Sequence, residues 1–188
     1  MPNIRPLRTL DEYNVLPFFG FSGVVPATKG TIVKIHSGWN TEQEIDELGD
    51  VGAHWNNTVS QRYGVAAKVC PCAGSGDAAV GIMLYDVREV DENGNKLIFN
   101  YDKQQRMQAV LSGQPVPIAT EGVFLYSGVN GGNTPVVGVV AGANCYLGPD
   151  GQVNVSGSVT NGNVTRFGKF LGVPDSKGWT LISFDFKK

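Results

Sequence analysis

The pair Cys70 and Cys72, separated by Pro71, is the first place in the sequence where side-chain chemistry could be concentrated. Structural zinc sites use cysteine pairs with two to four intervening residues and a matching second pair of ligands. Redox motifs of the Cys-x-x-Cys kind need two intervening residues. Here one residue intervenes, and the only other thiol is Cys145. We therefore predict small buried thiols, no metal site and no cofactor.

His36 and His54 are the only histidines, so they are the only imidazole bases available for catalysis. A Ser-His-Asp or Cys-His site needs a nucleophile, a base and a third group that orients the base. No Gly-x-Ser-x-Gly motif accompanies either histidine. The sequence predicts a protein that is not an enzyme. A dispersed active site around one of these histidines stays open as the last of three alternatives.

Residues 91–95 (DENGN) are similar to the start of a calcium-binding loop. An EF-hand needs glycine at its sixth position and glutamate at its twelfth, where this sequence has Lys96 and Asp102. Asn93 and Gly94 instead form the commonest two-residue hairpin signal. We predict a β-hairpin turn here.

Three tryptophans, Trp39, Trp55 and Trp179, could form a platform on which sugars stack. Buried aromatic anchors are commoner, and Trp179 lies within an apolar segment. The glycine-rich segments 74–77 and 128–133 match neither the P-loop nor the dinucleotide-binding motif. A carbohydrate-binding or receptor-binding module therefore stays open as the second alternative.

The composition indicates a protein rich in turns and without a nucleic-acid partner. The chain has 188 residues, enough for one domain, and 25 glycines dispersed between short apolar runs. With 15 Lys and Arg against 17 Asp and Glu, the net charge is −2 and no basic stripe is present. The first residues lack the apolar region of a signal peptide, and no stretch is long and apolar enough for a membrane helix. We expect a protein that contacts no membrane and is made in a cytoplasm.

Short strand patterns separated by turn residues recur along most of the chain. They predict an all-β domain, a single compact β-barrel, β-tulip or sandwich over residues 29–188. The expected strands are residues 31–35, 65–69, 80–85, 122–126, 136–140, 144–147, 152–156, 167–172 and 179–186. One or two short helices are expected, the first after a capping box at Thr41–Glu44. The second segment, residues 102–111, is either a helix or extended.

Residues 1–28 predict an extended N-terminal arm. Four prolines in this segment oppose regular structure, because proline lacks a backbone donor and restricts the residue before it. The arm is nevertheless apolar, so either its own domain or another chain must cover it. The large apolar residues are Leu7, Leu10, Tyr13, Val15, Leu16, Phe18, Phe19 and Phe21.

Several phrases of the sequence resemble the capsid decoration (cement) proteins of tailed bacteriophages. The shared pattern is a proline or polar residue, then glycine, then a β-branched strand, followed by a strand with a central glycine. It is carried by residues 26–35 (PATKGTIVKI), 79–82 (AVGI), 113–118 (GQPVPI), 122–125 (GVFL), 142–153 (GANCYLGPDGQV), 170–173 (FLGV) and 179–184 (WTLISF).

The resemblance implies a structural virion protein that binds the outside of a phage capsid and stabilises the mature head by bridging major capsid subunits. It implies the major capsid protein as partner, a homo-oligomer with a trimer favoured, and a place on the capsid exterior. The alternative in this setting is a carbohydrate- or receptor-binding module of a phage tail or head fibre.

We expect the arm to supply the capsid or inter-subunit contact. Its candidate contact residues are Leu7, Leu10, Tyr13, Leu16, Phe18, Phe19 and Phe21. On this hypothesis, removing residues 1–21 abolishes capsid binding and leaves the β domain folded.

Overall fold

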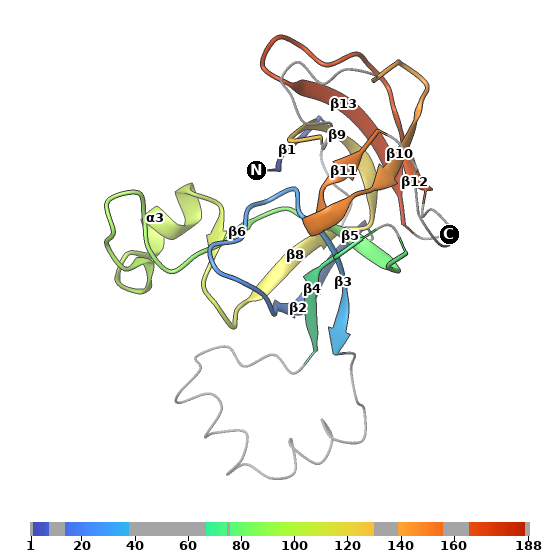
Figure 1. Cartoon of the computed structure of the whole chain (residues 1–188). Helices are drawn as coiled ribbons and strands as arrows, with labels where there is room; N and C mark the ends of the chain where they lie inside the picture. The colour runs from blue at the N-terminus through green and yellow to red at the C-terminus, as the bar shows by residue number, and fades with distance from the viewer. Residues whose placement is uncertain are drawn as a thin grey trace.

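Two β-sheets of different kinds make up most of the structure (Figure 1). The computed structural model describes residues 2–7, 14–37, 67–74, 76–129, 139–155 and 166–186. Of the described residues, 48% are in strands and 10% in helices, which confirms the predicted all-β class.

The first sheet closes into a five-stranded barrel with the strand order β2-β4-β3-β5-β8. Its strands are β2 (Val15–Phe21), β3 (Ile32–Ser37), β4 (Lys68–Pro71), β5 (Ala79–Met83) and β8 (Pro115–Ala119). Only the β2–β4 pair is parallel, and the pairing of β8 with both β2 and β5 closes the barrel. Closure removes the free edges that an open sheet would expose.

The second sheet is open, with six strands in the order β1-β9-β13-β12-β10-β11. Its strands are β1 (Asn3–Pro6), β9 (Glu121–Ser127), β10 (Asn144–Leu147), β11 (Val153–Asn154), β12 (Arg166–Phe170) and β13 (Trp179–Asp185). The 3-10 turn η3 (Pro149–Gly151) connects β10 to β11. All neighbours in this sheet are antiparallel.

The two sheets share a hydrophobic core because three barrel strands, β3, β5 and β8, are buried on both faces. In β3, Ile32 packs in the core between barrel and sheet, whereas Val33 packs inside the barrel. The neighbours Ile82 and Met83 in β5 divide in the same way. Since successive side chains of a strand point to opposite faces, a strand with two buried faces needs a continuous apolar run. The barrel wall is therefore also the surface on which the open sheet packs.

The N-terminal segment that the sequence predicts as an extended arm contributes a strand to each sheet. β1 forms the edge of the open sheet against β9, and β2 is a barrel strand. The prolines fit at permissive places: Pro6 ends an edge strand, and Pro17 lies where the register of β2 shifts between Leu16 and Phe19. Edge strands and bulges are the positions in a sheet that tolerate a missing backbone donor.

Residues 88–108 leave the barrel as a protrusion, which we call the knob (Figure 1). A short parallel pair closes its base, β6 (Asp86–Val87) with β7 (Ala109–Val110). The knob contains the 3-10 turn η2 (Leu97–Phe99) and the helix α3 (Tyr101–Arg106). The second predicted helix is thus present but ends at Arg106, and Ala109 and Val110 are in a strand.

The predicted helix after Thr41 and most of the predicted strand 136–140 lie outside the described residues. In the part of the chain that the structure describes, no helix is long and apolar enough to span a membrane.

Candidate docking surface

One face of the open sheet packs on the barrel, and the other, which we call the outer face, carries a second set of apolar side chains. The register places Arg5, Leu125 and Leu181 directly opposite one another on β1, β9 and β13. Directly opposite residues of antiparallel strands share a face, and residues two apart along a strand do so too. The outer face therefore includes, besides this row, Val123 and Trp179.

Arg5 and Trp179 form a stacked pair on the outer face. The guanidinium carbon of Arg5 lies 4.7 Å from the centre of the Trp179 ring. This cation–π contact holds an exposed cation over a half-buried aromatic ring. Tryptophan and arginine are the residue types over-represented among the side chains that dominate protein–protein binding energies.

Exposed aliphatic side chains continue the outer face. Leu7 donates its backbone N–H to the carbonyl of Val123 and is 53% exposed. On the other side of β13, Leu171 donates its backbone N–H to the carbonyl of Leu181, and its side chain is 47% exposed. Val173, two residues further along the chain, is 68% exposed. An apolar sheet face bordered by exposed leucine and valine is the kind of surface that another protein covers.

The structure divides the predicted contact residues among different environments. Leu7 lies beside the outer face. Phe19 and Phe21 are buried inside the barrel, and Leu16 packs against the same core. The protein's own domain therefore covers these three side chains, which was one of the two possibilities for the arm. Phe18 is within β2, and Leu10 and Tyr13 lie outside the described residues.

Sequence reasoning missed the outer face and assigned Trp179 to a buried position. The signal was present in the alternation of β13, where residues 179, 181, 183 and 185 are half-buried and the residues between them are buried. The pattern shows that one side of β13 is less covered than the other. It does not show which distant strands add their apolar side chains to that side.

Two of the three cysteines, Cys72 and Cys145, lie where burial makes them unreactive. Cys72 and Cys145 are fully buried in the shared core, and burial raises the pKa of each thiol to about 12. Cys70 is half-buried opposite Lys34, and all three thiols are free. Over the described ranges, no three His, Cys, Asp or Glu side chains are grouped so that they could hold a metal ion. His36 is exposed, and His54 is outside these ranges.

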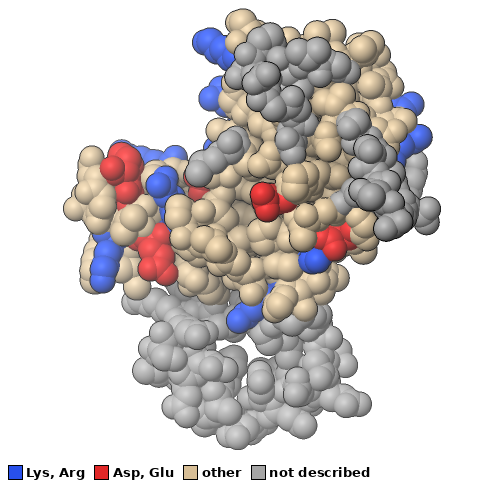
Figure 2. All heavy atoms as spheres, in the orientation of Figure 1, with Lys and Arg blue, Asp and Glu red and all other residues tan. Residues whose placement is uncertain are grey.

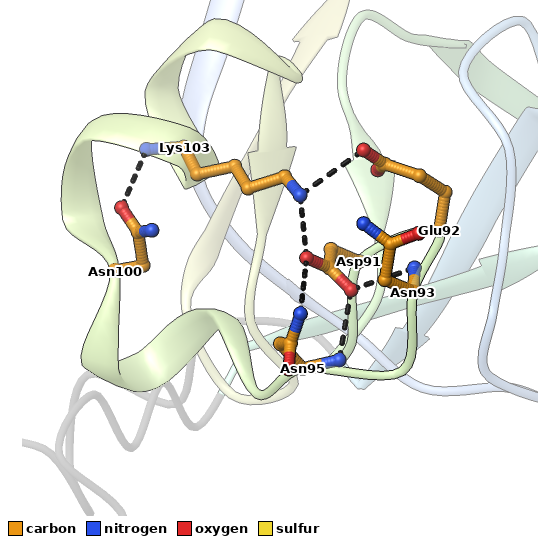
Figure 3. A network of polar contacts seen from close by, with 6 residues as sticks. All are labelled: Asp91, Glu92, Asn93, Asn95, Asn100 and Lys103. Atoms are coloured by element: carbon orange, nitrogen blue, oxygen red, sulfur yellow. Dashed lines mark hydrogen bonds and ion pairs between the residues drawn. The ribbon is translucent and has the colours of Figure 1, made fainter.

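A turn is present at Asn93 and Gly94, but only the isolated bridge between Val90 and Lys96 pairs its two sides, so the predicted β-hairpin is reduced to the turn. The acidic side chains beside this turn contact a cationic side chain (Figure 3). The buried Asp91 carboxylate accepts backbone N–H groups from Asn93 and Asn95, each at 2.8 Å. It also accepts a hydrogen bond from the ammonium of Lys103. The same ammonium nitrogen lies 3.0 Å from a carboxylate oxygen of Glu92. These contacts, the Lys103 hydrogen bond foremost, hold the pKa of Asp91 well below its usual range. The lysine ammonium takes the place that a metal ion would need between the two carboxylates.

No protein-family model and no curated protein matches this sequence.

Proposed function

We propose that this protein is a non-enzymatic structural protein of a tailed-bacteriophage virion. It binds the outer surface of the capsid and stabilises the mature head by bridging major capsid subunits. The observation that carries the proposal is the outer face of the open sheet, an apolar surface with the Arg5–Trp179 pair at one side and exposed Leu7 at the other. The resemblance of the sequence to phage decoration proteins supports the major capsid protein as the partner.

The proposal names the major capsid protein of the same virus as the partner and the capsid exterior as the location. Copies of the chain form a homo-oligomer, with a trimer favoured, and the chain is made in the host cytoplasm. Charge supports a protein partner over nucleic acid. On the visible side of the molecule, the basic side chains are dispersed among acidic ones and form no stripe (Figure 2).

In this proposal the outer face makes the capsid contact that the sequence analysis predicts for a free N-terminal arm. Among the residues predicted for that contact, Leu7 keeps an exposed side chain. Phe19 and Phe21 stabilise the barrel instead. A rigid sheet face also loses less conformational entropy on binding than a disordered arm does.

Immunogold labelling of intact phage particles from the source culture, with antibody to this protein, tests the proposal. Regular, dense label over the head is the expected result. Label confined to the tail would favour the receptor-binding alternative, and particles without label would remove the virion assignment altogether.

A further inference from the structure

Arg5 is a cation in an otherwise apolar part of the outer face. It lies in one row with Leu125 and Leu181, and Trp179 is in the next row of the sheet. The side chain of Arg5 is exposed, whereas those of its three apolar neighbours are half-buried. A partner that covers this part of the outer face therefore also covers the guanidinium.

In the described part of the chain, no carboxylate forms an ion pair with Arg5. Asp175, close to Trp179 in the chain, uses its Oδ1 atom to accept two backbone N–H groups, that of Trp179 among them. Glu121 and Asp185 also lie on the outer face, opposite each other. They are four residues along β9 and β13 from the row of Arg5, which is about 13 Å at a rise of about 3.3 Å per residue. The positive charge of Arg5 is thus available to another molecule.

The contact with Trp179 restrains the Arg5 side chain without satisfying it. The guanidinium carbon lies 4.7 Å from the centre of the ring, which offers no hydrogen-bond acceptor in the usual sense. A guanidinium has five N–H donors in a fixed fork, and this geometry matches the two oxygens of a carboxylate. A side chain restrained before binding also loses less conformational entropy when it pairs.

Covering an unpaired guanidinium opposes binding, because the charge loses its hydration and receives no counter-charge in return. A purely apolar partner would therefore be disfavoured by Arg5. A carboxylate on the partner removes that penalty. It also fixes the orientation, since opposite charges across an interface favour one partner and one register.

From these observations we infer that the capsid surface presents an aspartate or glutamate carboxylate to Arg5, surrounded by apolar side chains that pack on Leu125 and Leu181. The inference rests on the proposed function and adds the chemistry of the partner surface, which is apolar with a negative charge opposite Arg5. Lys169, also exposed on the outer face, gives that negative charge a second cation nearby.

The Arg5→Leu variant separates this inference from a purely apolar contact. It enlarges the apolar surface, so a purely apolar contact would bind capsids at least as well as before. A partner carboxylate would instead be left covered and unpaired, and the affinity should fall about thirtyfold or more. Lys68→Leu is the matched control, because Lys68 is exposed on the barrel strand β4 and the change removes the same charge. Co-sedimentation with capsids that lack the protein measures the affinity, and thermal melting checks that each variant is folded.

The Arg5→Lys variant then identifies the partner residue. It places a primary amine at the contact, and a zero-length carbodiimide joins such an amine to a carboxylate as an amide while taking up the water that is lost. At saturating concentration on the capsid, mass spectrometry should find position 5 joined to an aspartate or glutamate of the major capsid protein. Lys68 of the same variant should give no such product.

Three results would overturn the inference. If Arg5→Leu binds capsids as tightly as the wild type or more tightly, the contact is purely apolar, and the proposed function stands without the carboxylate. A crosslink from Lys68 in place of position 5 would show that the barrel faces the capsid. If the wild type does not bind capsids at all, the proposed function fails and the inference fails with it.

Discussion

At the scale of single residues, Asp91 shows how one buried carboxylate organises the knob. Its oxygens accept hydrogen bonds from the backbone N–H groups of Asn93 and Asn95 (Figure 3). They also accept hydrogen bonds from the side-chain amide of Asn95 and from the ammonium of Lys103. All of these contacts favour the charged form, so the pKa of Asp91 is lower in the folded protein than in the unfolded chain. A carboxyl group of this kind stabilises the fold above its unfolded pKa of about 3.9 and loses that contribution as the pH falls.

Replacing Asp91 by asparagine should therefore lower the melting temperature at pH 7 and reduce its dependence on acid pH. The amide keeps an acceptor oxygen but has no charge for Lys103 to pair with. Thermal melts between pH 2 and pH 7 measure both effects. Asp150→Asn is the control, because Asp150 is exposed and its left-handed φ of 55° suits asparagine. If both variants lose stability in acid as steeply as the wild type, Asp91 does not have this role.

The turn at residues 93–94 could be predicted, but the lysine that stabilises it could not. Asparagine followed by glycine signals a turn because Gly94 adopts a φ of 82° that other residues resist. Lys103 comes from a helix further along the chain, and no local pattern relates it to Asp91. The same limit applies to the outer face, where Arg5 and Trp179 are far apart in sequence.

At the scale of elements, the barrel strands that are buried on both faces should be the part of the molecule that tolerates substitution least. Ile82 in β5 is fully buried between barrel and sheet. We expect Ile82→Ala to lower the free energy of unfolding by about 2–5 kcal/mol, through lost burial and the cavity left behind. Ile98→Ala on the knob, at a side chain 46% exposed, should change it by only about 0.5 kcal/mol. Urea unfolding of both variants provides the comparison, and equal losses would contradict the two-faced burial of β5.

The N-terminal elements lead to a different expectation for truncation from the one that their sequence suggested. Removing residues 1–21 takes away β1 and β2, and with them Phe19 and Phe21 from the barrel core. We now expect the truncated protein to have no cooperative thermal transition, because an opened barrel exposes its core and two strand edges. The full-length Leu7→Glu variant keeps both strands and should melt like the wild type. A truncated protein that stays folded would show that the segment acts as a separable arm.

The sequence does not predict the strands at residues 3–6 and 15–21, because their prolines oppose regular structure although the segments are apolar. Proline opposes a strand only where the backbone donor would be used, and that depends on the partner strand. β1 pairs with β9 and β2 with β8, and the paired residues are at least 95 positions apart in each case. Pairing over such distances is a tertiary property. The all-β class followed from turns and strand patterns, which are local.

At the scale of the whole molecule, the barrel and the open sheet leave three surfaces with different roles. The inner face of the sheet stabilises the fold by packing on the barrel. The outer face and the knob remain available for contacts with other molecules. In the proposed assembly, the outer face contacts the capsid, and the end of the knob, with exposed Phe99 and Tyr101, is a second surface on another part of the molecule. A bridging protein needs at least two such surfaces, since one surface alone could only attach it.

The outer face leads to the last prediction, a loss of capsid binding without loss of fold. Leu7→Glu places a charge beside the apolar face, and Trp179→Ala removes the ring under Arg5. Each change should weaken binding to capsids by about tenfold or more, as expected for a central aromatic anchor or a charge forced into an apolar contact. Co-sedimentation of the purified variants with capsids that lack the protein measures the affinity.

Val24→Glu is the matched control, because Val24 is 87% exposed but belongs to a loop of the barrel. It should bind capsids as the wild type does. If Val24→Glu abolishes binding while Leu7→Glu and Trp179→Ala retain it, the capsid contact lies on the barrel side and the outer face must have another partner. If all three bind normally, the apolar outer face is not used on the capsid, because a charge in a desolvated apolar contact cannot be neutral in energy.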